Sequence, residues 1–249
     1  MRRFGLIGYP LGHSFSRRYF TEKFLREGRS DCLYELFPLA SIGELPNLLA
    51  EFPDLEGFNV TIPYKVQILP FLSSLDPASA SVGAVNTVSV RNGELRGYNT
   101  DVWGFQTSLK GFLPETFKGR ALVLGSGGAS RAVQYVLRKM GIDFTVVSRR
   151  PGPGGLGYTA LDAAALQAHS LIVQTTPLGM YPQDHTSPPI PYNLLSKAHY
   201  LYDLVYNPEE TIFLQKGKEE GAQVKNGLEM LYLQAEKAWE IWNEKPGPI

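Results

Sequence analysis

Residues 121–132 read ALVLGSGGASRA. The four apolar residues at the start predict a buried strand, and the pattern from Ala129 to Met140 predicts a helix. Glycines at such a turn from strand to helix let the backbone approach a pyrophosphate, whose charge the positive end of the helix stabilises. With a further strand predicted over 144–147, the stretch indicates a βαβ unit of the dinucleotide-binding kind.

The residues after this unit indicate which dinucleotide it binds. An NAD site usually has Asp or Glu about 20 residues after the glycines, where it binds the ribose hydroxyls. Here the second strand is followed by Ser148, Arg149 and Arg150, so that acidic group is absent. Because a guanidinium can bind phosphate through two hydrogen bonds, we predict that Arg149, helped by Arg150, binds the 2′-phosphate of NADP. The alternative is an exposed basic turn. The predicted phosphate loop comprises Gly125, Ser126, Gly127, Gly128 and Ala129.

Strands and helices alternate on both sides of this unit, which is typical of α/β architecture. Asn92-Gly93, between the segments 86–90 and 94–98, predicts a β-hairpin. We expect an N-terminal α/β domain over 1–105, joined by C-terminal helices in 222–249, and a Rossmann-like domain over 106–221. The other predicted strands cover 4–8, 33–38, 57–62, 171–174 and 200–204, and the other helices 15–27, 44–51, 102–110 and 228–242.

Composition excludes several classes of protein. The chain has 24 Lys plus Arg and 24 Asp plus Glu, so it lacks the basic excess typical of nucleic-acid binding. No apolar stretch approaches the roughly 20 residues of a membrane span. A single cysteine, Cys32, allows no internal disulfide and fits a reducing cytoplasm. We expect no metal site, because ligand spacing is absent among His13, His169, His185 and His199.

Polar clusters follow several predicted strands and indicate a ligand site. In open α/β sheets, ligands bind at the carboxyl ends of the strands. A hydrolase based on His13 and Ser14 is a weak alternative, because adjacent residues of an extended chain point apart and no Gly-x-Ser-x-Gly motif is present. The clusters lie at 13–16, 59–65, 83–87 and 97–101, with later ones at 206–208 and 226–230 and at Gln234.

Two residues in these clusters are candidates for acid–base chemistry. Pro63 suits the first position of a helix, which would place Lys65 in its first turn. A cation there faces the positive end of the helix dipole, so the neutral amine is favoured and can act as a general base. The alternative is a solvated lysine. Asp101 precedes the predicted helix 102–110, where it could serve as an N-cap, as a catalytic carboxylate, or as both.

Taken together, the motifs resemble those of the shikimate dehydrogenase family, whose members reduce 3-dehydroshikimate to shikimate with NADPH. The resemblance extends from Gly5 to Trp242. It is carried by GHSFS at 12–16, NVTIPYK at 59–65, GAVNT at 83–87, GYNTD at 97–101, GSGGA at 125–129, TTPLGM at 175–180 and QA at 234–235.

The resemblance implies a role for each matching residue. It implies an N-terminal domain that binds shikimate, a second domain that binds NADP, a cleft between them, a monomer or homodimer, and a place in the pathway to chorismate and aromatic amino acids. Lys65 and Asp101 match the catalytic pair. Ser14 and Ser16 match the groups that bind the substrate carboxylate. The other matches are Thr61, Asn86 and Gln234 to ring hydroxyls, Tyr206 to the substrate site, Leu204 and Gly227 to the nicotinamide, and Ser148 and Arg149 to the start of an Asn-Arg-Thr motif.

The chain also departs from the family pattern. Arg17 replaces a common proline, Ser148 and Arg150 replace the Asn and Thr of Asn-Arg-Thr, and Gln174 replaces a common asparagine. The Gly/Pro-rich segment 151–155 stands where the family usually has a helix and a strand with a further arginine, so the Rossmann half is shortened on its adenine side. Two alternatives stay open: a quinate or mixed quinate/shikimate dehydrogenase that uses NAD, and a non-catalytic NADP-binding sensor.

Overall fold

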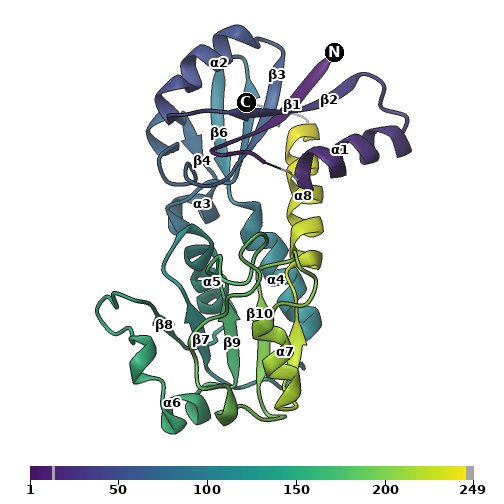
Figure 1. Cartoon of the computed structure of the whole chain (residues 1–249). Coiled ribbons are helices and arrows are strands. Elements are labelled where there is room, and N and C mark those ends of the chain that lie inside the picture. The colour runs from purple at the N-terminus through teal and green to yellow at the C-terminus, as the bar shows by residue number, and fades with distance from the viewer. Residues whose placement is uncertain (13–14, 245–249) are drawn as a thin grey trace. The chain divides into compact units, whose positions relative to one another are not determined.

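The computed structural model describes residues 1–12 and 15–244. Contacts between Cα atoms divide the chain into two compact units, each with its own β-sheet (Figure 1). Unit 1 comprises Met1–Thr100 and Ala235–Ile249, and unit 2 comprises Asp101–Gln234. Within the described residues, every helix is too short or too polar to cross a lipid bilayer.

Unit 1 contains a six-stranded mixed sheet in the order β2-β1-β3-β5-β6-β4. Neighbouring strands are parallel except for β3–β5 and β5–β6, which are antiparallel. The predicted hairpin is confirmed as β5–β6, and both turn residues, Asn92 and Gly93, have positive φ. The strands are β1 (Arg2–Gly8), β2 (Cys32–Pro38), β3 (Leu55–Val60), β4 (Ser74–Leu75), β5 (Thr87–Arg91) and β6 (Glu94–Tyr98).

Helices cover both faces of this sheet because side chains along β1 alternate between them. Phe4 and Leu6 contact α1 (Phe15–Arg26) and the C-terminal part of α8 (Leu228–Asn243). Ile7 joins a second core with Phe37 and with Leu45 and Leu48 of α2 (Leu45–Glu51). A short helix, α3 (Pro77–Val82), leads toward β5. Short 3-10 helices lie at Ile42–Glu44, Leu69–Phe71, Tyr158–Ala160 and Tyr192–Leu194.

Trp242 anchors the end of α8 to the sheet of unit 1. Its ring stacks on Phe4 with centroids 4.9 Å apart, and its Nε1 donates to the Val88 carbonyl at 2.9 Å. A Cβ at Gly57 would lie 2.3 Å from the Trp242 ring, so only glycine leaves room for the indole. These contacts confirm the prediction that the C-terminal helix returns to the first domain.

Unit 2 contains a five-stranded parallel sheet in the order β11-β10-β9-β7-β8. The chain order reverses at β7, which lies between β8 and β9. This reversal is the point at which doubly wound sheets bind ligands, and the glycine loop follows β7 directly. The elements are α4 (Thr100–Phe112), β7 (Ala121–Leu124), α5 (Gly128–Lys139), β8 (Phe144–Val147), α6 (Ala163–Ala168), β9 (Leu171–Gln174), β10 (Tyr200–Asp203), α7 (Ile212–Glu219) and β11 (Gln223–Lys225).

The segment after β8 is short, as predicted. In the described part of unit 2, β8 is the last strand on its side of the sheet. Leu156 N donates to the Val146 carbonyl at 2.9 Å, and Ser148 N donates to the Leu156 carbonyl at 3.0 Å. The Gly/Pro segment therefore folds back along β8 and satisfies part of its exposed edge, where a longer chain would add a strand.

Two local predictions are wrong. The residues after Pro63 form turns in place of a helix, because the carbonyl of Lys65 accepts from Val85 N at 2.8 Å and is committed to a distant segment. Lys65 therefore does not lie in the first turn of a helix, and the predicted helix dipole beside its amine is absent. Asp101 is the second residue of α4 rather than its N-cap, since the helix already begins at Thr100.

The fully buried side chain of Asp203 holds the turn after β10 through two hydrogen bonds. Its Oδ1 accepts from Val205 N at 2.9 Å, and its Oδ2 accepts from the Thr211 hydroxyl at 2.6 Å. Burial raises the pKa of this carboxyl to about 7, although both hydrogen bonds favour the ionised form and lower it.

We predict that Trp242→Ala lowers the free energy of unfolding by about 3–5 kcal/mol, because it removes a buried aromatic ring and a hydrogen bond. Denaturant unfolding measures the loss. Leu25→Ala, at a side chain 78% exposed, is the control and should stay within about 0.5 kcal/mol of wild type. Equal stability of Trp242→Ala and wild type would contradict the anchoring role of α8.

Asp203 should make stability fall as pH rises. Its folded pKa lies above the unfolded value near 3.8, so its contribution is present below pH 4 and is lost as pH rises toward 7. The slope from this group is at most about 1.4 kcal/mol per pH unit. Urea unfolding of Asp203→Asn should lack this slope, while Asp184→Asn, at an exposed position, should keep it. Parallel pH curves for Asp203→Asn and wild type would refute this account.

Candidate active site

The Lys65 segment lies at the carboxyl end of β3. Thr61 N donates to the Ile7 carbonyl at 2.9 Å, which holds the first residue after β3 against β1. The backbone carbonyl of Lys65 accepts from Val85 N, so Lys65 is fixed beside the loop that carries Asn86. The side chains of Thr61 and Lys65 are both half-buried. Unit 1 thus brings three predicted residues, Thr61, Lys65 and Asn86, to neighbouring loops.

Asn86 holds the start of α4. Its Oδ1 accepts from Thr100 N at 2.7 Å, and its Nδ2 donates to the Thr100 hydroxyl at 3.0 Å. Asp101, the next residue, is 8% exposed and lies in the first turn of α4. The positive end of the helix dipole stabilises a carboxylate at that position. Asp101 is therefore tied to Asn86 through its covalent neighbour.

Of the two serines predicted to bind the substrate carboxylate, the structure describes only Ser16. Ser14 lies outside the described residues, together with His13. Ser16 is half-buried in the first turn of α1. Burial raises the pKa of Tyr34 of β2, and the Ser16 hydroxyl lowers it. The Tyr34 hydroxyl donates to Asn59 Oδ1 at 2.8 Å.

In unit 2, the glycine loop has the geometry of a phosphate site. Gly125 has φ +113°, and a Cβ there would meet the Thr175 hydroxyl at 2.7 Å, so a larger residue is excluded. Gly127 is the N-cap of α5, and a Cβ at Gly127 would meet nothing within 4 Å. Ser126 and Gly127 are exposed, while Gly128 and Ala129 are half-buried. A helix N-terminus with open space in front of it can receive a phosphate.

Ser130 stands where phosphate loops of this kind usually have a third glycine. Its buried hydroxyl donates to the Gly125 carbonyl at 2.7 Å and accepts from Gln134 Nε2 at 2.9 Å. The loop is therefore closed by a side chain from the first turn of α5. Gln174, which also departs from the family pattern, holds the turn after β9. It accepts from Thr176 N at 3.1 Å and donates to the Leu178 carbonyl at 3.2 Å.

The predicted residues for the 2′-phosphate follow β8. Ser148 is buried, whereas Arg149 and Arg150 are exposed on the surface of the short segment. The charge of Arg149 acts on the nearby Tyr158 hydroxyl and lowers its pKa, against burial, which raises it more strongly. Arg149 thus lies near Tyr158, in the segment that follows β8.

Leu204 and Gly227, both predicted to line the nicotinamide, lie in contact. A Cβ at Gly227 would be 2.2 Å from the Leu204 carbonyl oxygen, so the close approach needs glycine. Gly227 N donates to the Val205 carbonyl at 3.1 Å. The remaining predicted residues, Tyr206 after β10 and Gln234 in α8, are half-buried.

Sequence reasoning missed several buried polar residues that support these groups. Asn59 and Thr87 stood inside quoted motifs, and their polarity within apolar strands was a signal that went unused. Tyr34 and Ser130 carried no such signal, because a tyrosine in a strand and a serine in a helix are ordinary. The missed residues are Tyr34, Asn59, Thr87, Thr100 and Ser130.

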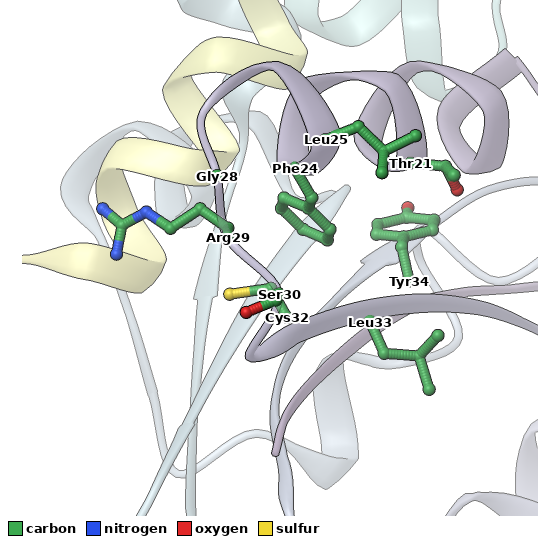
Figure 2. A pocket seen from close by; sticks show the side chains of 9 residues that line it. All are labelled: Thr21, Phe24, Leu25, Gly28, Arg29, Ser30, Cys32, Leu33 and Tyr34. Atoms are coloured by element: carbon green, nitrogen blue, oxygen red, sulfur yellow. The ribbon is translucent and has the colours of Figure 1, made fainter.

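A pocket of about 340 Å³ lies between α1 and β2, and none of the described predicted residues lines it (Figure 2). Phe24, Leu25, Arg29, Cys32 and Tyr34 are among its lining residues. Across residues 1–12 and 15–244, no three His, Cys, Asp or Glu side chains gather as a metal site would require.

Comparison with known proteins identifies the family. Residues 6–88 match the family model described as the shikimate dehydrogenase substrate binding domain. The chain is 35% identical to shikimate dehydrogenase (NADP(+)) of Methanococcus maripaludis over 96% of this chain and 90% of that protein. It is 36% identical to shikimate dehydrogenase (NADP(+)) of Carboxydothermus hydrogenoformans, covering 98% of this chain and 92% of the relative.

The fold agrees with these matches. The structure resembles shikimate 5-dehydrogenase of Thermus thermophilus in complex with NADP(H) and shikimate, with a TM-score of 0.86 and 35% identity, over 98% of this chain and 94% of that one. The predicted fold class, an α/β substrate domain followed by a Rossmann-like NADP-binding domain, is confirmed. With more than a third of its residues identical over nearly its whole length, the chain belongs to the shikimate dehydrogenase family.

Proposed function

We propose that the protein is a shikimate dehydrogenase that reversibly reduces 3-dehydroshikimate to shikimate with NADPH, in the pathway to chorismate and aromatic amino acids. The observation that carries this proposal is the identity of about a third to enzymes of that name over 96–98% of the chain. A cytoplasmic location and a monomeric or homodimeric state complete the proposal. Unit 1 binds the substrate, and unit 2 binds the cofactor.

The residues of unit 2 fit NADP. Gly125 admits a close backbone approach, the N-terminus of α5 opens onto free space at Gly127, and Arg149 supplies an exposed guanidinium after β8. Residues Gly125–Ala129 hold the pyrophosphate, Arg149 and Ser148 hold the 2′-phosphate, and Leu204 and Gly227 line the nicotinamide. The bound cofactor supplies the hydride chemistry, while the protein supplies position and electrostatics.

Lys65 and Asp101 carry the proton transfer. When the ketone becomes an alcohol, its oxygen must gain a proton, and the Lys65 ammonium donates one; in the reverse reaction the amine accepts it. The Asp101 carboxylate lies in the first turn of α4, at the positive end of the helix dipole, and orients the ammonium and the substrate hydroxyl. The Asn86–Thr100 hydrogen bonds support this arrangement because they fix the residue before Asp101.

The remaining polar groups bind the ring acid. The hydroxyls of Ser14 and Ser16 donate to the carboxylate, which suits a charged acceptor because such hydrogen bonds are stronger than neutral ones. Thr61, Asn86 and Gln234 bind the ring hydroxyls, and Tyr206 completes the substrate site. The substrate is thus held by many hydrogen bonds, which favours a polyhydroxylated acid over an apolar alcohol.

A spectrophotometric assay of NADPH formation from shikimate tests the proposal. The value of kcat/KM should be highest for shikimate with NADP, and quinate and NAD should each be poorer. Preference for quinate with NAD would replace the proposal with a quinate or mixed quinate/shikimate dehydrogenase. Tight NADP binding without turnover of either acid would indicate a non-catalytic sensor.

Lys65→Ala should lower kcat by about 10²–10⁴-fold and change the KM for shikimate little, because it removes the proton donor. Lys65→Arg should also be slow, since a guanidinium keeps its proton even though it keeps the charge. Steady-state kinetics measure both variants. Lys118→Ala, at an exposed lysine, is the control, and a wild-type kcat in Lys65→Ala would remove Lys65 from the mechanism.

Arg149→Ala should raise the KM for NADP by about 10–100-fold, because hydrogen bonds to a charged phosphate contribute about 1.5–3 kcal/mol. The KM for NAD should stay near its wild-type value. Arg150→Ala, measured in parallel, separates the contribution of the second arginine. Equal losses for NADP and NAD in Arg149→Ala would refute the assignment of the 2′-phosphate to this residue.

A further inference from the structure

Asp203 is a buried acidic side chain that takes no part in the proton transfer proposed above. It is the last residue of β10, and it is 0% exposed. Burying a carboxylate is unfavourable because the charge loses its water, and burial accordingly raises the pKa of Asp203 to about 7. A neutral side chain at the end of the strand would avoid this penalty. The reason for an acid at this position therefore lies in what its two oxygens bind.

One oxygen of Asp203 holds the turn that carries the residues predicted to line the nicotinamide. Oδ1 accepts from Val205 N at 2.9 Å, across a turn with Leu204 at its middle. Leu204 N donates to the Gln174 carbonyl, at the end of β9, at 3.0 Å. The Val205 carbonyl accepts from Gly227 N at 3.1 Å. The backbone on both sides of Leu204 is thus fixed, and Gly227 is held against it.

The second oxygen connects this turn to α7 and to the loop after β9. Oδ2 accepts from the Thr211 hydroxyl at 2.6 Å, and the same hydroxyl caps α7 by accepting from Leu214 N at 3.4 Å. A Cβ at Gly179 would meet the Thr211 Cβ at 3.4 Å, so the loop after β9 lies against Thr211. Figure 1 shows β9 and β10 as neighbours in the sheet of unit 2. Asp203 therefore joins the segments that follow two adjacent strands.

The two bonds explain why the side chain is acidic. Val205 N and the Thr211 hydroxyl both donate, and both residues are buried. An ionised carboxylate accepts on both oxygens, whereas an asparagine of the same shape accepts on one and presents a donor amide at the other. A buried donor without an acceptor is destabilising, so each of these groups requires an oxygen. Aspartate satisfies both donors at once.

We propose that Asp203 is a positioning residue for hydride transfer: it fixes the turn of residues 204–206 against Gly227, so that the nicotinamide is held in one orientation. This inference rests on the proposed function, in which Leu204 and Gly227 line the nicotinamide and Tyr206 lies in the substrate site. Hydride transfer depends on the alignment of donor and acceptor carbons, and a small displacement caused from outside the reacting groups can lower the rate strongly.

A positioning role should separate kcat from the affinity for NADP. The phosphates of the cofactor are assigned to the glycine loop and to Arg149, which follow β7 and β8 rather than β10. Loss of the Asp203 carboxylate should therefore change the Kd for NADP little, while the nicotinamide adopts several orientations and kcat falls. A purely structural role predicts less folded protein, with an unchanged kcat for each folded molecule.

Asp203→Ala tests the proposal, because it removes both acceptors. Titration calorimetry with NADP counts the folded sites and gives the Kd, and assays are run above the pKa of Asp203. The value of kcat per NADP-binding site should fall at least about 10-fold, while the Kd for NADP stays within about threefold of wild type. Asp203→Asn keeps an acceptor for Val205 N and should restore kcat per site to within about threefold of wild type.

Asp162→Ala is the matched control. Asp162 is exposed, and its carboxylate accepts from a backbone N–H, that of Ala165, at 2.8 Å at the start of α6. The variant thus loses a bond of the same kind as the one from Val205 N, in the same unit. Both kcat per site and the Kd for NADP should stay at their wild-type values.

Two results would overturn the proposal. One is a wild-type kcat per site in Asp203→Ala, and the other is an equal loss in Asp203→Asn and Asp203→Ala, which would assign the effect to the charge rather than to the bond with Val205 N. If Asp203→Ala has no NADP-binding sites, Thr211→Val is measured in its place. It removes the donor to Oδ2 and should lower kcat per site about 2–5-fold, and a wild-type value would again overturn the proposal. Wild-type protein that binds NADP without turning over shikimate would instead refute the proposed function.

Discussion

The buried side chain of Asn86 is the constraint on which the site in unit 1 depends. The first backbone N–H groups of a helix have no partner inside it, and Asn86 Oδ1 accepts the one from Thr100. This bond fixes the start of α4 against a loop fourteen residues earlier in the chain. Asp101 then follows by covalent geometry. A buried amide left unpaired would cost about 1–3 kcal/mol, so the arrangement is enforced by desolvation as well as by attraction.

The same rule accounts for the hydrogen-bond network that joins Tyr34, Asn59, Thr87 and Thr100. Within residues 1–12 and 15–244, every fully buried side-chain nitrogen or oxygen has a hydrogen-bond partner. Asn59 and Thr87 sit in strands whose neighbours are apolar, and each is satisfied by the other. Such a network has few alternative arrangements, because moving one member leaves another unpaired. Asn86, which is bonded to both Asn59 and Thr100, is held in place by this network.

In unit 2, the glycine loop allows the backbone to approach a phosphate closely. Gly125 allows a positive φ and a close contact with Thr175, and Ser130 closes the loop with a bond to the Gly125 carbonyl. The short segment after β8 shows how the chain ends this sheet with fewer residues. It pairs briefly with β8 and leaves Arg149 exposed beside Tyr158. The glycine loop keeps its geometry because it depends on α5 and on β7 and β9, two strands that lie inside the sheet rather than at its edge.

The sequence by itself determined the elements whose cause is local. Apolar runs, the glycines of 125–128 and Asn92-Gly93 specify strands, a phosphate loop and a hairpin through conformational preferences of neighbouring residues. The motifs also indicated most candidate site residues, including Lys65, Asp101 and Asn86. Tertiary structure alone decided the turns around Lys65, the first residue of α4 and the buried hydrogen bond of Tyr34. Each of these depends on a hydrogen bond between segments distant in the chain, from Val85 to Lys65, from Thr100 to Asn86 and from Tyr34 to Asn59. Such bonds form only once the strands have adopted their register, and no single stretch of the sequence determines that register.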